Sequence, residues 1–439
     1  MIRAPATSGQ LIRGFGLWGL AALILNGIIG AGVFALPGSV AQFAGSWAPL
    51  VILGVGFAFL PVVLVFAWLA GMFDETGGPI IYVREAFGTA AGFQTGWVQS
   101  LATTAASAAN ANVLADYLLR LAPAGQTGAL AHGAVVLTAI GLAFAVNMLA
   151  IRNSDRWIKL ITALKLLPLV LLVALALPAL AGGPALLPAG EWSLAQAILL
   201  SVYAFTGFEG ALCLGGEARD PQTDFPRALV AVFLFTVALY AALAWGYVAT
   251  AYAPGTADKA ALLTMGALLA GALGAGLVVC AAVFSIFGNV ITTPMNTSRR
   301  LLALEQIGML PGWFGVIHAG SGIPRNAVVF TYAVVALLAM SGGFAALAVL
   351  SVAARLVVYF ACAAALPMVR RRRGLPMPAG MIAVVGAALA ICLLLIAQSD
   401  LKAWLGLMLA IMIGFVVTWI AAPARAKPGP IAGEPGGTP

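Results

Sequence analysis

The sequence predicts an all-α membrane protein with 12 transmembrane helices, of which helices 1 and 6 are discontinuous. Composition is the first observation behind this prediction. Of the 439 residues, 62% are hydrophobic and 8% are charged, and the mean hydropathy is +1.05. A soluble chain of this length could not cover its surface with so few polar residues. The other two observations are a series of apolar stretches of spanning length and two glycine-rich interruptions in them.

Twelve apolar stretches approach or exceed the roughly 20 residues that a bilayer core requires. Short loops separate these stretches, and most of the basic residues lie in the loops. The net charge of +8 therefore indicates membrane orientation rather than a nucleic-acid partner. The predicted spans are approximately 17–43, 48–72, 92–120, 129–149, 157–182, 193–216, 227–252, 264–298, 326–343, 345–369, 379–399 and 401–422.

The loop charges also predict the topology. With both termini in the cytoplasm, nearly all loop Lys and Arg residues fall inside, and only Arg120, Lys259 and Lys402 fall outside. Lys165 and Arg355 lie within spans. We therefore expect a multi-pass protein of a bacterial-type inner membrane.

The domain organisation follows from these spans. A cytoplasmic N-terminus (1–16) precedes a single transmembrane domain (17–422), and a Gly- and Pro-rich tail (423–439) is predicted to be disordered and cytoplasmic. The transmembrane domain comprises repeat one (17–182), repeat two (193–369) and helices eleven and twelve (379–422). The four cysteines are scattered singly without the spacing of metal ligands, and the sequence predicts no metal and no cofactor.

The first span contains three glycines within six residues, Gly27, Gly30 and Gly32. Each glycine destabilises a helix interior by roughly 1 kcal/mol relative to alanine. If the helix opens here, its unpaired N–H and C=O groups must line a polar cavity or bind a ligand, because lipid cannot satisfy them. The alternative is that the glycines let another helix pack closely. The glycines alone support both interpretations equally.

The sixth span has a similar interruption, in which Gly207 and Gly210 flank the acidic Glu209 at mid-depth. If the first ten spans form two five-span halves, the first and sixth spans occupy equivalent positions. Paired interruptions of this kind are the best sequence indication of the central site of a secondary transporter. The pair therefore favours the first interpretation, in which opened helices bind a substrate.

Several motifs then resemble one family. They are Gly27-Ile28-Ile29-Gly30-Ala31-Gly32-Val33-Phe34, the stretch 75–88 that begins Glu75-Thr76-Gly77-Gly78-Pro79, Thr206-Gly207-Phe208-Glu209-Gly210, Gly216-Glu217-Ala218-Arg219-Asp220-Pro221, Asp224-Phe225-Pro226-Arg227-Ala228, and the stretch 299–327. Together they resemble amino acid permeases of the amino acid–polyamine–organocation superfamily over nearly the whole chain. The resemblance implies the fold of the leucine transporter, a 5+5 inverted repeat with discontinuous helices 1 and 6, plus two additional helices. It also implies alternating access and an amino acid substrate, but it does not specify which amino acid is carried.

The resemblance also implies roles for individual residues. The substrate carboxylate would bind the backbone amides of Ala31 and Gly32 beside Gly30, and its amino group would meet carbonyls near Ile28, Tyr203 and Thr206. Tyr203 and Phe205, which flank the break at Gly207, would close over the substrate. The alternative for both aromatic residues is ordinary core packing. Thr103 and Ser107 of the third span complete the predicted substrate-binding set.

Lys165 is the most informative single residue. It lies roughly 12 Å into the fifth span at 1.5 Å per residue, and an ammonium group inside a membrane is a functional candidate by default. The resemblance matches it to a lysine that stands where sodium binds in sodium-coupled relatives. Its ammonium would then bridge carbonyls of the first span and polar groups of the eighth, with Ser285 the expected partner. This argues against sodium coupling and leaves proton symport and exchange open.

Glu209 is the second ionisable group at mid-membrane depth, and two interpretations of it are equally supported. It could act as a proton-sensitive latch below the site, since burial favours the uncharged carboxyl group. It could also be a structural partner for the backbone or for Arg355. The two histidines, His132 and His318, fall near span ends, where packing beside a loop is expected.

A neutral amino acid is the predicted substrate. Thr103, Ser107 and Asn110 are neutral, and a cationic side chain would lack an obvious counter-ion other than Glu209. A basic amino acid or polyamine antiporter remains the alternative. A channel and a membrane-embedded enzyme are the alternatives of a different class; an enzyme would need clustered His, Asp or Cys, which this sequence lacks. The expected partners are the substrate, the lipid bilayer and, for symport, protons.

Overall fold

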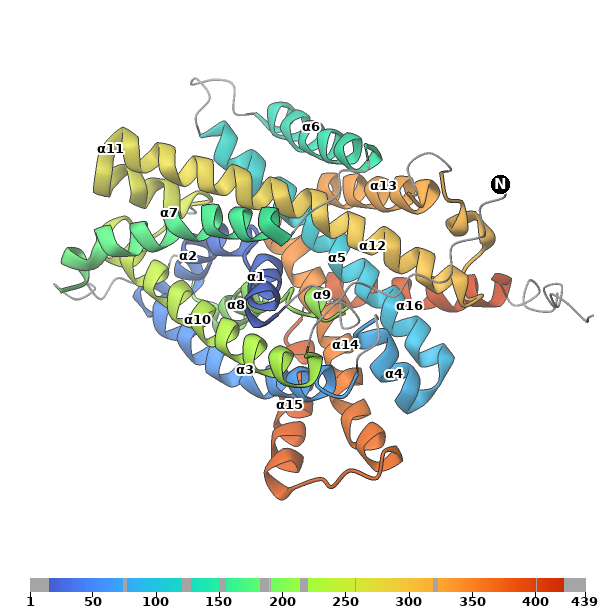
Figure 1. Ribbon diagram of the computed structural model, residues 1–439. Coiled ribbons are helices and arrows are strands. Elements are labelled where there is room, and N and C mark those ends of the chain that lie inside the picture. Colours follow the sequence, from blue (N-terminus) through green and yellow to red (C-terminus); the bar gives the residue numbers. More distant parts are fainter. Residues whose placement is uncertain are drawn as a thin grey trace, which may run out of the picture.

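The computed structural model of the chain describes residues 16–73, 77–120, 128–149, 155–181, 189, 191–213, 220–256, 258–318, 323–399 and 401–421. These residues form helices and their connections, and β-pairing among them is limited to one isolated bridge between Ile317 and Pro324. The predicted all-α class is confirmed (Figure 1). The predicted N-terminal segment up to residue 15, the tail from residue 422, and the motif residues Glu75, Glu217 and Arg219 lie outside the described residues.

The helices follow one another along the chain with short connections. Their bounds are α1 (Leu17–Ile28), α2 (Gly32–Ala44), α3 (Ala48–Ala70), α4 (Pro79–Phe87), α5 (Thr89–Leu119), α6 (Ala129–Met148), α7 (Asp155–Ala181), α8 (Leu194–Phe205), α9 (Glu209–Leu212), α10 (Pro221–Thr250), α11 (Ala261–Ala282), α12 (Gly288–Gln306), α13 (Arg325–Ser341), α14 (Phe344–Arg372), α15 (Ala379–Ala397) and α16 (Leu401–Ala421), with a π-helical segment η3 (Val283–Phe287) and 3₁₀ segments η1 (Gly45–Trp47) and η4 (Gly312–Gly315).

Nine helical stretches in the described part of the chain are long and apolar enough to cross a membrane. The protein is therefore a multi-pass membrane protein, and the prediction of 12 spans in an inverted repeat stays a prediction. Two further apolar helices, α1 and α13, are shorter. The 31-residue α5 is long enough but rich in Ala, Ser, Thr and Asn. Because α5 is buried along most of its length, it needs no apolar surface for lipid.

The predicted span 264–298 differs from the structure at its start. Backbone dihedrals leave the helical region at Ala270 and at Gly271, whose φ is +57°. The chain folds back there: a Cβ on Gly274 would lie 2.0 Å from the Gly266 carbonyl oxygen. Glycine at 271 permits the positive φ, and glycine at 266 and 274 permits the close backbone contact. The long helix of this region therefore begins after Gly271 and continues through η3 into α12.

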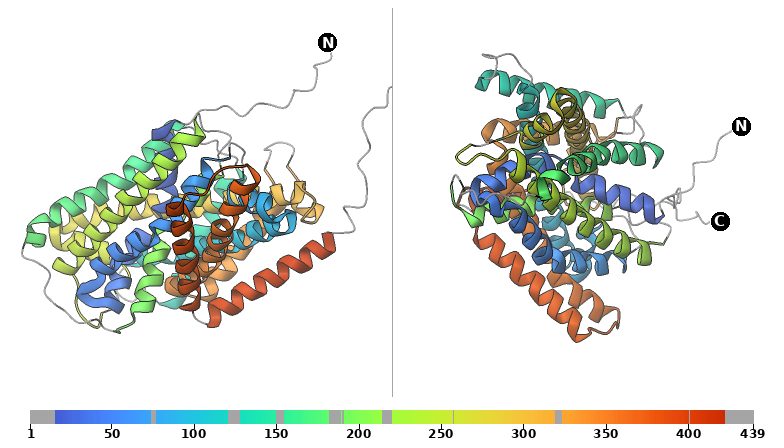
Figure 2. Two further views of the ribbon diagram at one scale, coloured as in Figure 1. Left: turned by 90° about the horizontal axis from the view of Figure 1, so that it is seen from below. Right: turned by 90° about the vertical axis from the view of Figure 1, so that its left-hand side faces the viewer.

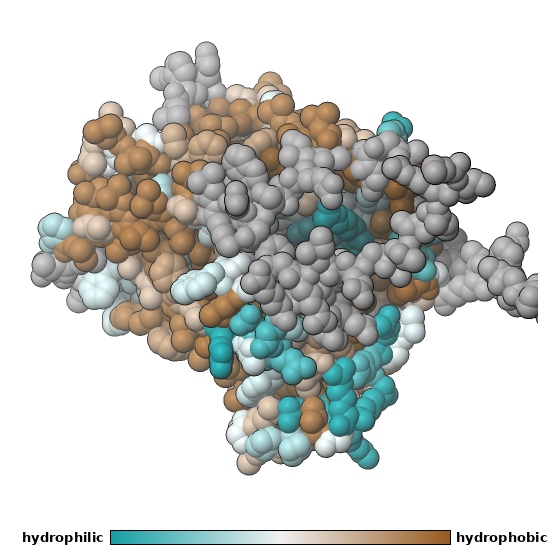
Figure 3. Space-filling model, viewed as in Figure 1, coloured by the Kyte–Doolittle hydropathy of each residue, from teal (hydrophilic) through white to brown (hydrophobic). Residues whose placement is uncertain are grey.

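The bundle has a central group of helices and an outer layer. Figure 1 shows α1, α2, α8 and α9 in its middle, with α5 and α14 packed beside them. Figures 1 and 2 place α6, α15 and α16 on the outside. The outer surface of α15 and α16 carries exposed Leu393, Leu394, Leu405, Met412 and Trp419, as expected for helices that face lipid. Figure 3 shows this kind of apolar surface on the side of α7, α10 and α11, whereas hydrophilic residues gather around the connection between α14 and α15.

Candidate functional site

The first predicted helix break is present between α1 and α2. Ile29, Gly30 and Ala31 are outside both helices, and Ile29 has extended dihedrals of −76° and 90°. Helix α2 starts at Gly32, so the N–H groups of Ala31, Gly32 and Val33 have no carbonyl one turn earlier to accept from them. The positive end of the α2 dipole and three N–H donors thus lie at one point inside the bundle, which suits a carboxylate.

The second predicted break is present between α8 and α9, at Thr206, Gly207 and Phe208. Gly207 adopts a φ of +112°, which L-residues with a side chain rarely adopt. Its N–H donates to Oε2 of Glu209 at 3.0 Å. The acidic residue therefore holds the backbone of the break open.

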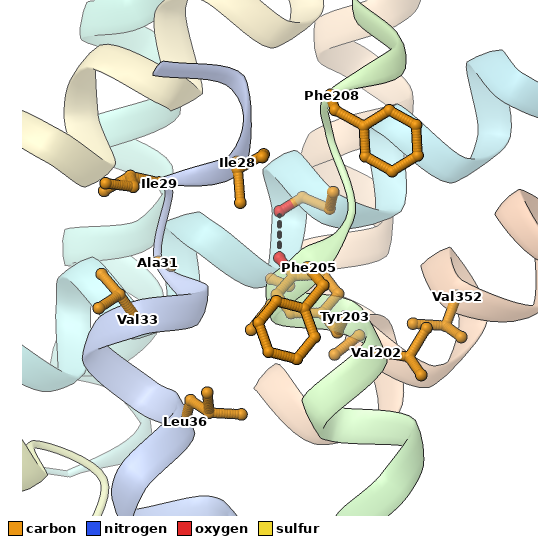
Figure 4. Packing of buried hydrophobic residues seen from close by; sticks show 14 of the residues in the cluster. Ile28, Ile29, Ala31, Val33, Leu36, Val202, Tyr203, Phe205, Phe208 and Val352 are labelled. Atoms are coloured by element: carbon orange, nitrogen blue, oxygen red, sulfur yellow. Dashed lines mark hydrogen bonds between the residues drawn. The ribbon is translucent and has the colours of Figure 1, made fainter. Parts of the chain in front are cut away.

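The two breaks face each other at backbone contact distance. A Cβ on Gly27 would lie 2.7 Å from the Gly207 carbonyl oxygen, and a Cβ on Gly207 would lie 2.3 Å from the Gly27 carbonyl oxygen. A Cβ on Gly32 would lie 3.0 Å from Cα of Ala204. Figure 4 shows the two opened segments beside each other, with Ile28, Ile29 and Ala31 of one opposite the other. Close packing and helix opening, the two interpretations of these glycines, therefore occur together.

This contact yields a stability prediction. We expect Gly207→Ala to destabilise the protein by about 1–3 kcal/mol, because alanine at a φ of +112° is strained and its Cβ would meet the Gly27 carbonyl. Gly210→Ala is the matched control, since a Cβ there meets nothing within 4 Å. Thermal unfolding of the purified variants in detergent measures the difference. Equal unfolding temperatures for the two variants would contradict the close contact.

The carbonyl oxygen of Ile29 accepts from three side chains. Asn289 Nδ2 lies 3.1 Å from it, and Lys165 Nζ and Ser285 Oγ each lie 3.4 Å from it. Lys165 also donates to Oδ1 of Asn26, and its side chain is 1% exposed. Lys165 and Ser285, which the sequence analysis expected to be partners, thus both donate to the Ile29 carbonyl in the first break.

Glu209 is buried at the second break, and its carboxylate has three partners. Its Oε1 accepts from Nη1 of Arg355, and its Oε2 accepts from Tyr359 at 2.8 Å as well as from Gly207. Arg355 Nε donates to Ser351 Oγ at 3.3 Å, and Ser351 donates to an α5 carbonyl at 2.8 Å. The contacts are those of the structural-partner interpretation, because they connect α9, α14 and α5.

Tyr203 and Phe205 point to different neighbours. Tyr203 donates to Oδ1 of Asn110 at 3.0 Å, and its hydroxyl oxygen lies 3.4 Å from the Ala106 carbonyl oxygen of α5. Phe205 packs against Phe233 and Tyr240 of α10, with ring centroids 5.6 and 5.7 Å apart. Only Tyr203 therefore faces the polar side of α5, and the contacts of Phe205 are those of a core aromatic residue.

The predicted carbonyl acceptors are partly used inside the protein. The Tyr203 carbonyl accepts from N and Oγ1 of Thr206, at 3.2 and 2.7 Å. The Ile28 carbonyl accepts from Gly30 N at 3.0 Å. The Ile28 carbonyl thus has one donor within the protein, whereas the Tyr203 carbonyl already has two.

Thr103 and Ser107, the predicted substrate contacts on α5, differ in the hydrogen bonding of their hydroxyl groups. Thr103 Oγ1 lies 2.8 Å from Thr297 Oγ1 and accepts from Arg300 Nη1 at 3.4 Å, so it joins α5 to α12. The hydroxyl of Ser107 is fully buried and has no hydrogen-bond partner among the described residues.

Sequence reasoning missed several polar residues of this region. Asn26 accepts from the Lys165 ammonium group, and Asn289 donates to the Ile29 carbonyl. Tyr359 donates to Glu209. An asparagine within an apolar span is costly unless it is paired. Asn26 and Asn289 could have been selected on that ground, but the sequence carries no sign of which carbonyl or ammonium they meet.

A pocket of about 360 Å³ lies on the side of the bundle where the predicted outer loops lie. Its lining includes Asp116, His132, Lys259 and Phe344. His132 Nε2 lies 3.3 Å from Asp116, so it has a charged partner beyond the predicted loop packing. The ring of Phe344 contacts that of Tyr203, with centroids 5.5 Å apart. Two aromatic rings thus lie between this pocket and the breaks.

A multi-pass helical bundle with two opened helices facing each other at its centre defines a membrane transport protein rather than an enzyme. The chain matches the amino acid permease family over residues 15–420, and it belongs to that family.

Relatives in several organisms are transporters. An uncharacterised transporter of Mycobacterium tuberculosis is 31% identical over 404 residues, which cover 87% of each chain. The glutamate/serine transporter AimA of Bacillus subtilis is 27% identical, covering 73% of this chain and 64% of its own. The human large neutral amino acids transporter small subunit 2 is 28% identical, covering 73% of this chain and 63% of its own.

Proposed function

We propose that this permease is a secondary active transporter that carries a neutral amino acid by alternating access, without sodium. The observation that carries the proposal is the pair of facing breaks, which presents N–H donors at Ala31 and Gly32 opposite the carboxyl end of α8. A zwitterion satisfies both ends at once. Because the Tyr203 carbonyl is already used, we assign the substrate ammonium to the carbonyls of Ile28 and Thr206.

The proposal of a neutral substrate is supported by the contacts of Glu209. A cationic side chain buried near the breaks would need an anionic partner, and Glu209 is already neutralised by Arg355. This supports a neutral amino acid over the alternative, a basic amino acid or a polyamine. The alternative has its own support in a rice relative, the polyamine transporter PUT1, which is 30% identical over 326 residues.

The proposed coupling mode rests on Lys165. Its ammonium group binds Asn26 and the Ile29 carbonyl, and the family resemblance matches this lysine to one that stands where sodium binds in sodium-coupled relatives. We therefore propose proton symport or amino acid exchange. In symport, loss of the Lys165 proton would loosen the end of α1, whereas in exchange the ammonium group stays charged throughout.

Alternating access has support on both sides of the breaks. The pocket beside Phe344 would be the outer access path, and the Tyr203–Phe344 contact would separate it from the substrate. On the other side, the Glu209–Arg355 pair and the ring of Tyr359 stacked on Phe208 at 5.6 Å close the bundle. We place this arrangement in a 12-span, 5+5 inverted repeat with both termini in the cytoplasm of a bacterial-type cell.

Counterflow in proteoliposomes tests the proposal. Vesicles loaded with an unlabelled amino acid are expected to accumulate the same labelled amino acid from outside, with saturation and without added sodium. The matched amino alcohol, which lacks the carboxylate, should neither drive counterflow nor compete, because the α2 N–H donors require an anion. Flux that never saturates would indicate a channel, and chemical conversion of the substrate would indicate an enzyme.

A further inference from the structure

The pocket of about 360 Å³ contains a cluster of ionisable side chains that the proposed transport cycle does not use. His132 Nε2 of α6 lies 3.3 Å from Oδ1 of Asp116 on α5, and the two side chains are 28% and 16% exposed. Lys259, in the connection between α10 and α11, lines the same pocket and attracts the Asp116 carboxylate. Asp116 therefore faces two basic side chains, and one of them, His132, is charged only when it is protonated.

The connection between α10 and α11, here called the outer connection (251–256 and 258–260), lies directly on α2. A Cβ on Gly38 of α2 would lie 2.1 Å from the Asp258 carbonyl oxygen. The Asp258 carboxylate accepts from Arg120 at the end of α5, at 3.1 Å. The attraction between Asp116 and Lys259 is a second tie between α5 and the outer connection. These two ties hold the outer connection over the half-helix that begins at the first break.

The charges around His132 balance while its ring is neutral. Among the described residues that line the pocket, α2 and α14 contribute no ionisable side chain. The ionisable groups near His132 are Asp116 and Arg120 of α5, Asp258 and Lys259 of the outer connection, and Tyr247 of α10, which contacts Asp258 at 3.5 Å. Two carboxylates thus face two permanent cations. Because histidine is the side chain that ordinarily changes charge between about pH 5 and 8, acid adds one net positive charge to the cluster.

We propose that His132 is a pH sensor of the pocket, and that its protonation loosens the outer connection from α5 and α2. A protonated ring 3.3 Å from Asp116 neutralises the carboxylate that attracts Lys259, and it also repels the Lys259 ammonium group. One of the two ties is lost, whereas the ion pair of Arg120 and Asp258 remains. Acid therefore opens the pocket without detaching the outer connection. The inference rests on the proposed function only in taking this pocket as the outer access path.

Chemical labelling of a thiol in the pocket tests this inference without any substrate. Ser39 of α2 lines the pocket and is half-buried, so the rate at which a maleimide labels Ser39→Cys in lipid nanodiscs reports how open the pocket is. Mass spectrometry of the peptide that contains position 39 separates this label from that on the natural cysteines. Variants of His132 are compared in this background at one pH, so that the ionisation of the thiol itself cancels. At about pH 5.5, labelling with His132 present should be about fivefold faster than with His132→Gln.

At about pH 8 the same two proteins should be labelled at equal rates, because His132 is then neutral. His132→Lys, which keeps a positive charge, should be labelled rapidly at both pH values. His318→Gln is the matched control, since the second histidine does not line the pocket, and it should keep the acid response.

Equal labelling with His132 and with His132→Gln at about pH 5.5 would overturn the inference, and so would slow labelling of His132→Lys at about pH 8. Either result leaves amino acid counterflow, and with it the proposed function, untouched. Absence of counterflow with every amino acid would instead refute the proposed function, whatever the labelling shows.

Discussion

Replacement of Lys165 by alanine is expected to lower amino acid transport by about a hundredfold. The ammonium group of Lys165 holds two oxygen atoms of the first broken helix, Oδ1 of Asn26 and the carbonyl of Ile29. Hydrogen bonds from a charged donor contribute about 1.5–3 kcal/mol each. Losing both would shift the equilibrium between binding-competent and other arrangements of α1 by roughly 3 kcal/mol, which is about two powers of ten.

The fold itself should tolerate this change better than transport does. Removing the whole ammonium group also removes the cost of burying a charge, so the variant is not left with an unpaired ion. Ser285 and Asn289 still donate to the Ile29 carbonyl. Initial uptake rates in proteoliposomes measure the effect, with Lys402→Ala as the control, because Lys402 is exposed on the outer helix α16. Normal uptake by Lys165→Ala would exclude Lys165 from the mechanism.

The same variant separates the two coupling modes. If transport is proton symport through Lys165, an inward proton gradient should drive uptake by the wild-type protein and have no effect on Lys165→Ala. If transport is exchange, uptake by the wild-type protein should require internal amino acid and ignore the gradient. A gradient response that is unchanged in Lys165→Ala would place the proton elsewhere.

The two breaks could be predicted from sequence because glycine acts locally. Gly30 and Gly207 lie in spans that otherwise favour helix, and a backbone opened in a membrane must find partners nearby. The fold-back at Gly271 was missed although it also depends on glycine. Its stretch, Ala270-Gly271-Ala272-Leu273-Gly274, is as apolar as a continuous span, so hydropathy could not distinguish the two.

Side-chain partners were harder to predict because they depend on which helices are neighbours. Phe205 is adjacent to a break in sequence, yet the direction of its ring is set by Phe233 and Tyr240 of α10. Thr103 lies on the predicted face of α5, but its hydroxyl is bonded to α12. Arg355 was one of the partners that the sequence left open for Glu209, and the packing of the helices brings the two side chains together.

A large loss of stability is expected when the buried ion pair of Glu209 and Arg355 is broken. We expect Glu209→Gln to destabilise the protein by about 3–5 kcal/mol, because it leaves the buried guanidinium of Arg355 without its counter-ion. Replacing both residues, as Glu209→Gln with Arg355→Met, should cost clearly less, since no buried charge then remains. A double-mutant cycle on thermal unfolding in detergent measures the coupling between the two side chains.

A second ion pair of the same protein is the control for this cycle. Glu85 and Arg373 lie 2.9 Å apart, but their side chains are 30% and 34% exposed. Water screens such a pair, so Glu85→Gln should cost about 1 kcal/mol or less. Equal losses from Glu209→Gln and Glu85→Gln would mean that the Glu209 pair is hydrated. Glu209 would then be accessible to a cationic substrate, and the argument for a neutral amino acid would fail with it.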